Sequence, residues 1–153
     1  MISNEEIRLG YFADAKRIAE MSRVLIEHGL GWSWTPERVI REMQSKSSNV
    51  IVAVDGARII GFAIMSYGDQ EARLNLFAVD PGYRRKGVGT RLIQWLEKTA
   101  MIAGNGVVYL EARSGNTAAI RFYESLGYRV TQQIPRYYSG RETAVRMAHD
   151  LWS

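Results

Sequence analysis

The chain contains no cysteine and only two histidines, His28 and His149, among its 153 residues. The absence of cysteine excludes disulfide bonds, thiolate zinc sites and a cysteinyl intermediate. Two histidines are too few for a histidine-based metal cluster, so we expect no metal site. A chain without cysteine fits a reducing compartment, and we expect a cytoplasmic location.

Long hydrophobic runs are also missing. The longest apolar stretch, Ile59 to Met65, falls far short of the roughly 18 residues that a membrane-spanning helix needs. The first residues lack a basic segment followed by an apolar one, so we expect no signal peptide. Only three prolines are present, and no repeat or flexible linker divides the chain. We therefore expect one domain over residues 1–153, with no membrane contact.

Charge is unevenly distributed along the chain. The 20 basic and 16 acidic residues give a net charge of +4. Residues 1–76 carry 9 basic and 10 acidic side chains, whereas residues 77–153 carry 11 basic and 6 acidic ones. The second half is suited to an anionic partner, which is either a nucleic acid or a phosphorylated cofactor.

Apolar periodicity and turn residues predict four helices and six strands. Thr35-Pro36 is typical of a helix start, and Asp55-Gly56 is typical of a two-residue hairpin. The predicted helices are Phe12–Glu27, Pro36 to about Gln44, Gly89–Ala103 and Asn116–Leu126. The predicted strands are Val50–Val54, Ile59–Met65, Leu74–Val79, Val107–Ala112, Tyr128–Gln132 and Glu142–Leu151. This order indicates a mixed α+β fold with helices packed on a central sheet.

The segment from Val79 to Thr90 joins a predicted strand to a predicted helix and is both basic and glycine-rich. Backbone N–H groups are unpaired at a helix start, and Gly87 and Gly89 let the backbone approach an anion closely. Arg84, Arg85 and Lys86 add positive charge. The glycine spacing fits neither a dinucleotide-binding fingerprint nor a Walker A loop. We interpret the segment as a different kind of phosphate-binding loop; the alternative is an ordinary connection with a solvated basic face.

The spacing Val79-x-Pro81-x-x-Arg84-Arg85-x-Gly87-x-Gly89-x-x-Leu92 resembles the acetyl-CoA signature of the GNAT acetyltransferase superfamily. Residues 109–128 and Arg136-Tyr137-Tyr138 resemble, more narrowly, the RimI-type branch, which acetylates protein N-termini. The resemblance is detailed over residues 71–151 and weak over residues 1–70. It implies a GNAT-like fold with a mostly antiparallel sheet and splayed central strands.

The resemblance also implies acetyl-CoA as cosubstrate and assigns residues to it. The backbone of Phe77, Ala78 and Val79 would face the acetyl and pantetheine part. The pyrophosphate would be held by Arg84, Arg85, Lys86, Gly87, Val88, Gly89 and Thr90. Asn116, Ala119 and Tyr123 would make further cofactor contacts. Asn116 is in addition a predicted helix cap on its residue type alone.

Glu111 matches the general base of the RimI-type branch, and Glu71 is a second candidate. A carboxylate within the apolar strand Val107–Ala112 is costly unless it is used or paired. The structural alternative is a Glu111 paired with a nearby arginine, such as Arg113 or Arg136.

Tyr123 matches the general acid that protonates the departing thiolate of CoA. It lies seven residues after Asn116, which is two helical turns along the same face. The structural alternative is a buried tyrosine with a satisfied hydroxyl. Acceptor contacts are implied for Tyr137 and Tyr138 in one loop and for Trp34 in another. The Trp34 loop lacks the proline that precedes this tryptophan in the RimI-type pattern. Both histidines are interpreted as structural.

We therefore expect an acetyl-CoA-dependent N-acetyltransferase that acts by direct attack of an amine, most simply the α-amine of a protein N-terminus. A free α-amine has a pKa of about 7.7–8.0 and needs little help from a base, in contrast to a lysine side chain at about 10.4. One alternative keeps the enzyme but changes the acceptor to a small-molecule amine, such as a polyamine, antibiotic or amino acid. Two others are a basic nucleic-acid-binding domain and a cofactor-binding regulator without turnover; we do not expect nucleic acid as a partner.

Overall fold

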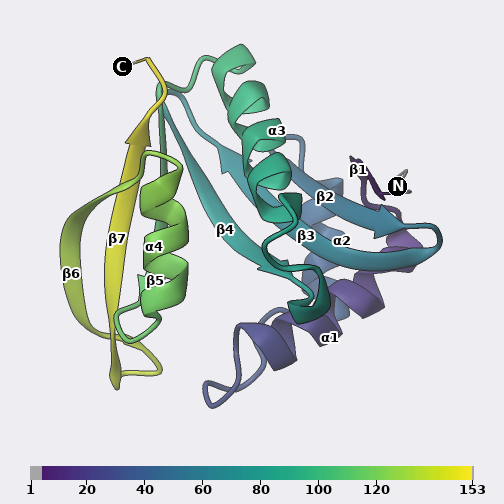
Figure 1. Cartoon of the computed structure of the whole chain (residues 1–153), viewed down its shortest axis with the longest axis horizontal. Coiled ribbons are helices and arrows are strands. Elements are labelled where there is room, and N and C mark those ends of the chain that lie inside the picture. The colour runs from purple at the N-terminus through teal and green to yellow at the C-terminus, as the bar shows by residue number, and fades with distance from the viewer. Residues whose placement is uncertain (1–4, 153) are drawn as a thin grey trace. The chain divides into compact units, whose positions relative to one another are not determined.

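The computed structural model describes residues 5–152 of the chain. In chain order the elements are β1 (Glu5–Leu9), the 3-10 turn η1 (Phe12–Asp14), α1 (Ala15–Leu25), α2 (Pro36–Gln44), β2 (Ser48–Asp55), β3 (Arg58–Tyr67), β4 (Glu71–Val79), the 3-10 turn η2 (Pro81–Tyr83), α3 (Val88–Ile102), β5 (Val107–Arg113), α4 (Thr117–Ser125), β6 (Arg129–Tyr138) and β7 (Glu142–Asp150) (Figure 1). No helix of this part of the chain is long and apolar enough to cross a membrane.

The strands of residues 5–152 form one sheet in the order β1-β2-β3-β4-β5-β7-β6. The β1–β2, β2–β3, β5–β7 and β6–β7 pairs are antiparallel, and β4 pairs with β5 in parallel. The predicted mixed α+β class with a mostly antiparallel sheet is confirmed.

The chain divides into two compact units that share β4 and α3. Unit 1 comprises Met1–Ser66 and Leu76–Leu96, and unit 2 comprises Tyr67–Asn75 and Glu97–Ser153. The expectation of a single domain over residues 1–153 stays a prediction.

The core of unit 1 lies on both faces of its strands. Alternate residues of β2, among them Val50 and Val52, pack with Ile18 of α1 on one face. On the other face, a Cβ atom at Gly61 of β3 would lie 3.2 Å from the side chain of Leu92, so α3 packs closely there. Thr35 caps α2 as predicted, because its hydroxyl accepts a hydrogen bond from the backbone N–H of Arg38 at 3.3 Å.

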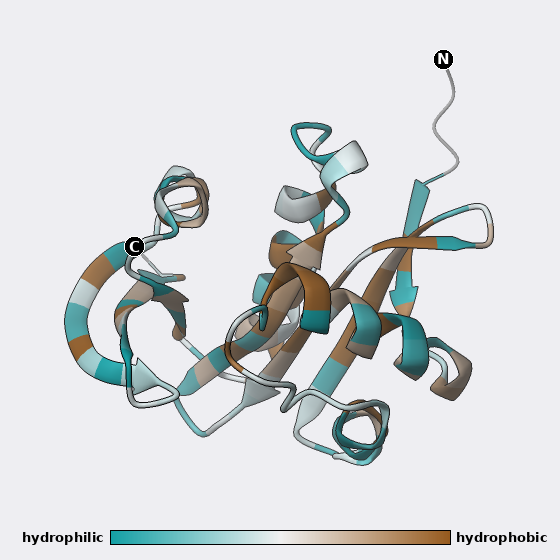
Figure 2. Cartoon of the chain, turned by 90° about the horizontal axis from the view of Figure 1, so that it is seen from below, coloured by the Kyte–Doolittle hydropathy of each residue, from teal (hydrophilic) through white to brown (hydrophobic). Residues whose placement is uncertain are grey.

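Unit 2 is built on β5, its antiparallel neighbour β7 and the edge strand β6, which pairs with β7. Val108, Leu110 and Ala112 of β5 are buried, whereas the alternating residues on the opposite face are half-buried. The pairing register places Glu111 of β5 opposite Arg146 of β7. The edge strand β6 is largely exposed, and its ribbon at the left of Figure 2 is mostly hydrophilic.

Two differences from the predicted elements have simple causes. Strand β1 was not predicted, because five residues of mixed polarity with a half-buried pattern give little periodic signal. Strand β6 was predicted to end at Gln132 but runs to Tyr138, with an irregular register between Ile134 and Tyr138. Pro135 lies in that irregular stretch, and proline is tolerated in a strand only at such edges and bulges.

Candidate active site

The predicted phosphate-binding segment forms an exposed basic turn at the start of α3. Arg85, Lys86 and Gly87 are exposed, and α3 begins at Val88, one residue before the predicted start. The first helical bond within α3 runs from the N–H of Arg91 to the carbonyl of Gly87 at 3.1 Å. The N–H groups of residues 88–90 therefore have no acceptor within the helix, as helix geometry requires.

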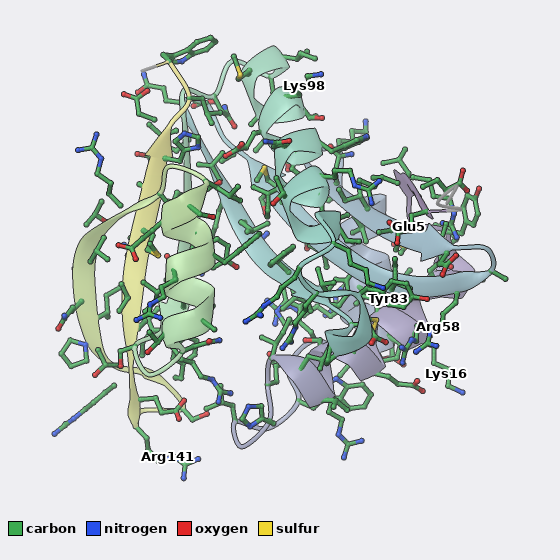
Figure 3. All side chains as sticks on the ribbon, viewed as in Figure 1. Glu5, Lys16, Arg58, Tyr83, Lys98 and Arg141 are labelled. Carbon is green, nitrogen blue, oxygen red and sulfur yellow. The ribbon has the colours of Figure 1, made fainter. Side chains whose placement is uncertain are left out.

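Hydrogen bonds and ion pairs of unit 1 hold the base of this turn. The carboxylate of Asp80 accepts from the backbone N–H of Gly82 at 3.0 Å and pairs with Arg58 at 3.1 Å. The hydroxyl of Tyr83 donates to Asp55 at 2.7 Å; Figure 3 labels Tyr83 and Arg58. The turn is therefore fixed at its base, while its basic residues stay accessible.

The exposed part of the turn fits a phosphate group. Gly87 has φ +80°, and a Cβ atom there would meet no atom within 4 Å apart from those of its chain neighbours. Open space, unpaired helix N–H groups and the partial positive charge of a helix start are features that favour the binding of an anion. Arg85 also adopts a positive φ of 64°, and its side chain is exposed.

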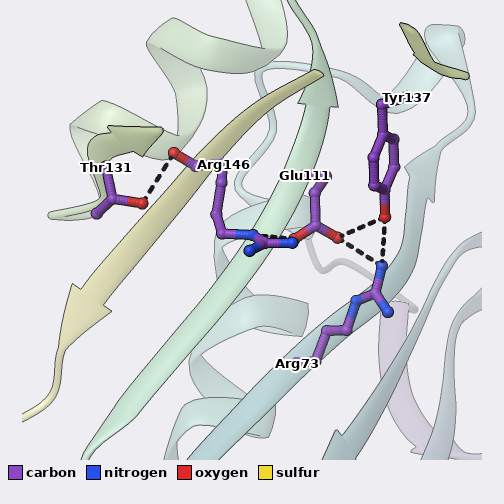
Figure 4. Close-up of polar contacts among 5 residues, drawn as sticks. All are labelled: Arg73, Glu111, Thr131, Tyr137 and Arg146. Atoms are coloured by element: carbon purple, nitrogen blue, oxygen red, sulfur yellow. Dashed lines mark hydrogen bonds and ion pairs between the residues drawn. The ribbon is translucent and has the colours of Figure 1, made fainter. Parts of the chain in front are cut away.

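Glu111 is the centre of an ion-pair network in unit 2 (Figure 4). Its Oε1 atom accepts from Nη2 of Arg73 at 2.5 Å and from the hydroxyl of Tyr137 at 3.3 Å. Its Oε2 atom accepts from Nε of Arg146 at 2.8 Å. The Arg73 Nη2 atom also donates to the Tyr137 hydroxyl at 2.9 Å. Both carboxylate oxygens are thus engaged, and the Glu111 side chain is only 4% exposed.

The arginine partners differ from the two suggested by the sequence. Arg113 pairs instead with Glu142 at 3.4 Å, and Arg136 makes no ion pair within the described residues. Arg73 comes from β4 and Arg146 from β7, and only the strand register brings them beside Glu111. Burial is the largest single effect on Arg73 and would lower its pKa, but the charge of Glu111, the neighbouring Tyr137 and Tyr109 and the hydrogen bond to Glu111 together raise it.

Tyr123 is buried in unit 2, close to Tyr138. Burial raises the pKa of Tyr123, and the neighbouring Tyr138 raises it further. Burial raises the pKa of Tyr138 to about 12, and Tyr137 and Glu111 add to this effect. Tyr138 is therefore electrostatically coupled both to Tyr123 and to the Glu111 network. The rings of Tyr137 and Tyr138 pack edge to face, 4.9 Å apart.

The other residues predicted to contact acetyl-CoA lie at the start of α4 and at the end of β4. Asn116 caps α4 as predicted, since its side chain accepts from the backbone N–H of Ala119 at 3.1 Å. That N–H group of Ala119 is therefore already used. Ala78 and Val79 are nearly buried at the end of β4, where the carbonyl of Val79 accepts from Nε of Arg84 at 3.4 Å.

The two tryptophans between α1 and α2 are placed differently from each other. Trp34, the predicted acceptor contact, is 8% exposed and belongs to the core of unit 1, whereas Trp32 is 37% exposed. Glu27, which the sequence did not single out, organises this loop. Its carboxylate accepts from the hydroxyl of Ser22 at 2.8 Å, from the N–H of Ser33 at 2.8 Å and from the N–H of Trp34 at 3.3 Å.

Comparison with known proteins decides the family. The model of the acetyltransferase (GNAT) family matches residues 17–128. This chain belongs to the GNAT acetyltransferase family. The predicted enzyme class, an N-acetyltransferase with acetyl-CoA as acetyl donor, is thereby confirmed. The family match favours this class over the alternative of a nucleic-acid-binding domain.

Several members of the GNAT family resemble this chain over most of its length. The N-alpha-acetyltransferase RimI of Mycobacterium tuberculosis is 34% identical over 131 residues, which are 82% of this chain and 79% of the relative. The ribosomal protein bS18-alanine N-acetyltransferase of Escherichia coli K12 is 34% identical over 79% of this chain and 82% of the relative. The crystal structure of Ard1 from Thermoplasma volcanium superposes with a TM-score of 0.87 at 27% identity, covering 97% of this chain and 98% of that one.

Proposed function

We propose that this GNAT enzyme acetylates the N-terminal α-amine of a protein by direct transfer from acetyl-CoA. The relatives that support this proposal are named for N-terminal or ribosomal-protein acetylation. The observation that carries it is the buried Glu111 carboxylate, held by two arginines beside a pair of tyrosines. The cytoplasmic location stays a prediction.

The donor is held by the basic turn of unit 1. Residues 84–90 present exposed cationic side chains and unpaired helix N–H groups to its diphosphate. Phe77, Ala78 and Val79 supply backbone hydrogen-bonding groups for its amides, in the way that a neighbouring strand would. When bound, acetyl-CoA supplies a thioester that an uncharged amine attacks.

Glu111 serves as the general base of this reaction. An α-amine with a pKa of about 7.7–8.0 is partly uncharged near neutral pH, so the base need only remove a proton as the new bond forms. Because the Glu111 side chain is 4% exposed and both its oxygens accept hydrogen bonds, the proton reaches it through one bridging water. Oε1 already accepts two hydrogen bonds, whereas Oε2 accepts only one and retains a lone-pair site for that water.

Tyr123 serves as the general acid. A raised pKa keeps its hydroxyl protonated throughout the physiological range, which a proton donor requires. Its hydroxyl donates to the departing sulfur, which limits the negative charge that develops there. Tyr138 couples this group to the Glu111 network.

Substitution of the two proposed catalytic residues tests the assignment. Glu111→Gln and Tyr123→Phe keep the side-chain size but remove the base and the acid. We expect each variant to lower kcat by about 10²–10⁴-fold for a short peptide acceptor, with acetyl-CoA affinity by calorimetry close to wild type. Glu71→Gln, at the exposed start of β4, is the matched control and should keep wild-type turnover.

Three results would contradict the proposal. Full turnover by both variants would refute the roles of Glu111 and Tyr123. Loss of turnover in Glu71→Gln alone would move the base to Glu71. Absence of heat on titrating CoA into the folded protein would refute the basic turn as the donor site. Circular dichroism of each variant separates loss of chemistry from loss of fold.

A further inference from the structure

The face of unit 2 that carries Glu111 presents positive charge, although its central group is a carboxylate. The side chains of Arg73 and Arg146 are 41% and 35% exposed, whereas that of Glu111 is 4% exposed. We propose that Arg73 and Arg146 select the acceptor, favouring an amine that carries a carboxylate nearby and disfavouring polyamines and other polycations. This inference rests on the proposed function, which brings the acceptor to Glu111.

Charge is not balanced within the network. Two guanidinium groups share one carboxylate, and neither arginine has a second acidic partner among the described residues. Glu71 lies on the same face of β4 two residues before Arg73, but within residues 5–152 it makes no ion pair with it. Arg113, the next cation along β5, is paired with Glu142. One positive charge therefore remains uncompensated beside the proposed base.

The two guanidinium groups are also held in place. Their central carbon atoms lie 6.0 Å (Arg73) and 5.6 Å (Arg146) from the centre of the Tyr109 ring. Each donates one hydrogen bond to Glu111 through a single nitrogen, Nη2 in Arg73 and Nε in Arg146 (Figure 4). A guanidinium has five N–H donors, so donors remain for a second carboxylate. Little conformational freedom is lost on binding, because Glu111 and Tyr109 already orient both groups.

The arrangement sorts acceptors by charge. Two half-exposed arginines repel a polyamine, or a peptide with basic first residues, as it approaches the proposed base Glu111. A carboxylate near the amine forms a charge-assisted hydrogen bond with Arg73 or Arg146 instead. This carboxylate has two sources: an acidic side chain in the first residues of a peptide, or the α-carboxylate of a free amino acid.

A set of acceptors that differ only in charge tests the inference. We would measure kcat/KM for C-terminally amidated peptides of equal length with Asp, Ala or Lys at position two, together with free alanine and spermidine. For the wild type we expect the order Asp, Ala, Lys, with about 10–100-fold between the first and the last, mainly through KM. Preference for the acidic peptide over free alanine assigns the carboxylate to a side chain, and the reverse assigns it to a free amino acid.

Variants then locate the preference. Arg146→Gln should reduce the ratio of kcat/KM for the Asp peptide to that for the Lys peptide about tenfold. Arg146→Lys should restore part of this ratio, because lysine returns the positive charge but not the several N–H donors of a guanidinium. Arg129→Gln, on the exposed edge strand β6, is the charge-matched control and should leave the ratio unchanged. In the wild type the ratio should also shrink as salt rises from about 0.02 to 0.5 M, since partly exposed charges are screened.

The outcomes separate this inference from the proposed function. Equal kcat/KM for the Asp and Lys peptides, or a ratio unchanged in Arg146→Gln, overturns the inference while peptide acetylation stands. Efficient acetylation of spermidine overturns it as well. Failure of the wild type to acetylate any amine, with acetyl-CoA still bound, overturns the proposed function and the inference together.

Discussion

Replacing Gly127 by alanine tests the packing at the end of α4. Gly127 follows α4 with φ +100°, and the N–H of Tyr128 bonds back to the carbonyl of Tyr123 at 3.1 Å, which ends the helix. A Cβ atom at Gly127 would lie 2.7 Å from Nε2 of His149. A normal contact is about 3.5–4.0 Å, so either the backbone or the imidazole must move.

The imidazole of His149 has little room to move. Its Nδ1 atom lies 2.7 Å from Oε2 of Glu97, and the same oxygen accepts from the hydroxyl of the buried Tyr128 at 2.9 Å. Two costs therefore add in the alanine variant. The positive φ costs about 1–2 kcal/mol for a residue with a Cβ atom, and overpacking against a fixed side chain costs about 1–3 kcal/mol. We expect Gly127→Ala to lower the free energy of unfolding by about 2–5 kcal/mol.

Gly104 provides a matched control at the end of α3. It has φ +90°, and the N–H of Asn105 bonds back to Ala100 at 2.8 Å in the same pattern, but a Cβ atom there would meet nothing within 4 Å. Gly104→Ala should therefore cost only the backbone contribution, about 1–2 kcal/mol. Urea unfolding followed by circular dichroism measures both variants.

A double-mutant cycle isolates the contact with His149. His149→Ala removes the ring that the new methyl group would strike, so Gly127→Ala should cost about 1–3 kcal/mol less in that background. Equal losses for Gly127→Ala and Gly104→Ala, or a Gly127→Ala penalty unchanged by His149→Ala, would refute the argument.

Two further predictions concern unit 1. Burial alone would raise the pKa of Asp14, but hydrogen bonds from Arg8 and the N–H of Tyr11 lower it below its usual value. The ionised Asp14 therefore stabilises the folded state fully above a pH of about 4, and this contribution is lost as the pH falls. Asp14→Asn should cost about 1 kcal/mol at pH 7 and progressively less below pH 4 in urea unfolding, and a gap independent of pH would contradict this. Glu27→Gln places an amide N–H against backbone donors of its loop, so it should lower the free energy of unfolding by about 1–3 kcal/mol and speed hydrogen exchange over residues 26–35. Glu20→Gln, at an exposed position, is the control. Equal stability of the two variants would refute this prediction.

Short-range features were predictable from the sequence. Thr35 and Asn116 cap helices as predicted, because a capping side chain bonds to a backbone group only three residues away. The turn before α3 is likewise encoded by its own glycines and cations. Its spacing was sufficient to indicate the GNAT family, which the family match then confirmed.

The chemistry around Glu111 was not predictable to the same extent. Alternation along β5 places Glu111 on the less buried face, but its partners come from β4 and β7, 38 and 35 residues away. The burial of Trp34 in the core of unit 1 was not predictable either, because burial depends on what packs over the loop. Its predicted contact with the acceptor stays a prediction.

The sequence by itself determined the turns, the caps, the basic turn before α3 and the family, since these depend on residues within a few positions of one another. Tertiary structure alone decided which charges surround the proposed base, because a strand's neighbours are set by register and sheet order. That register leaves two arginines exposed around one covered carboxylate, and the proposed acceptor preference follows from this arrangement.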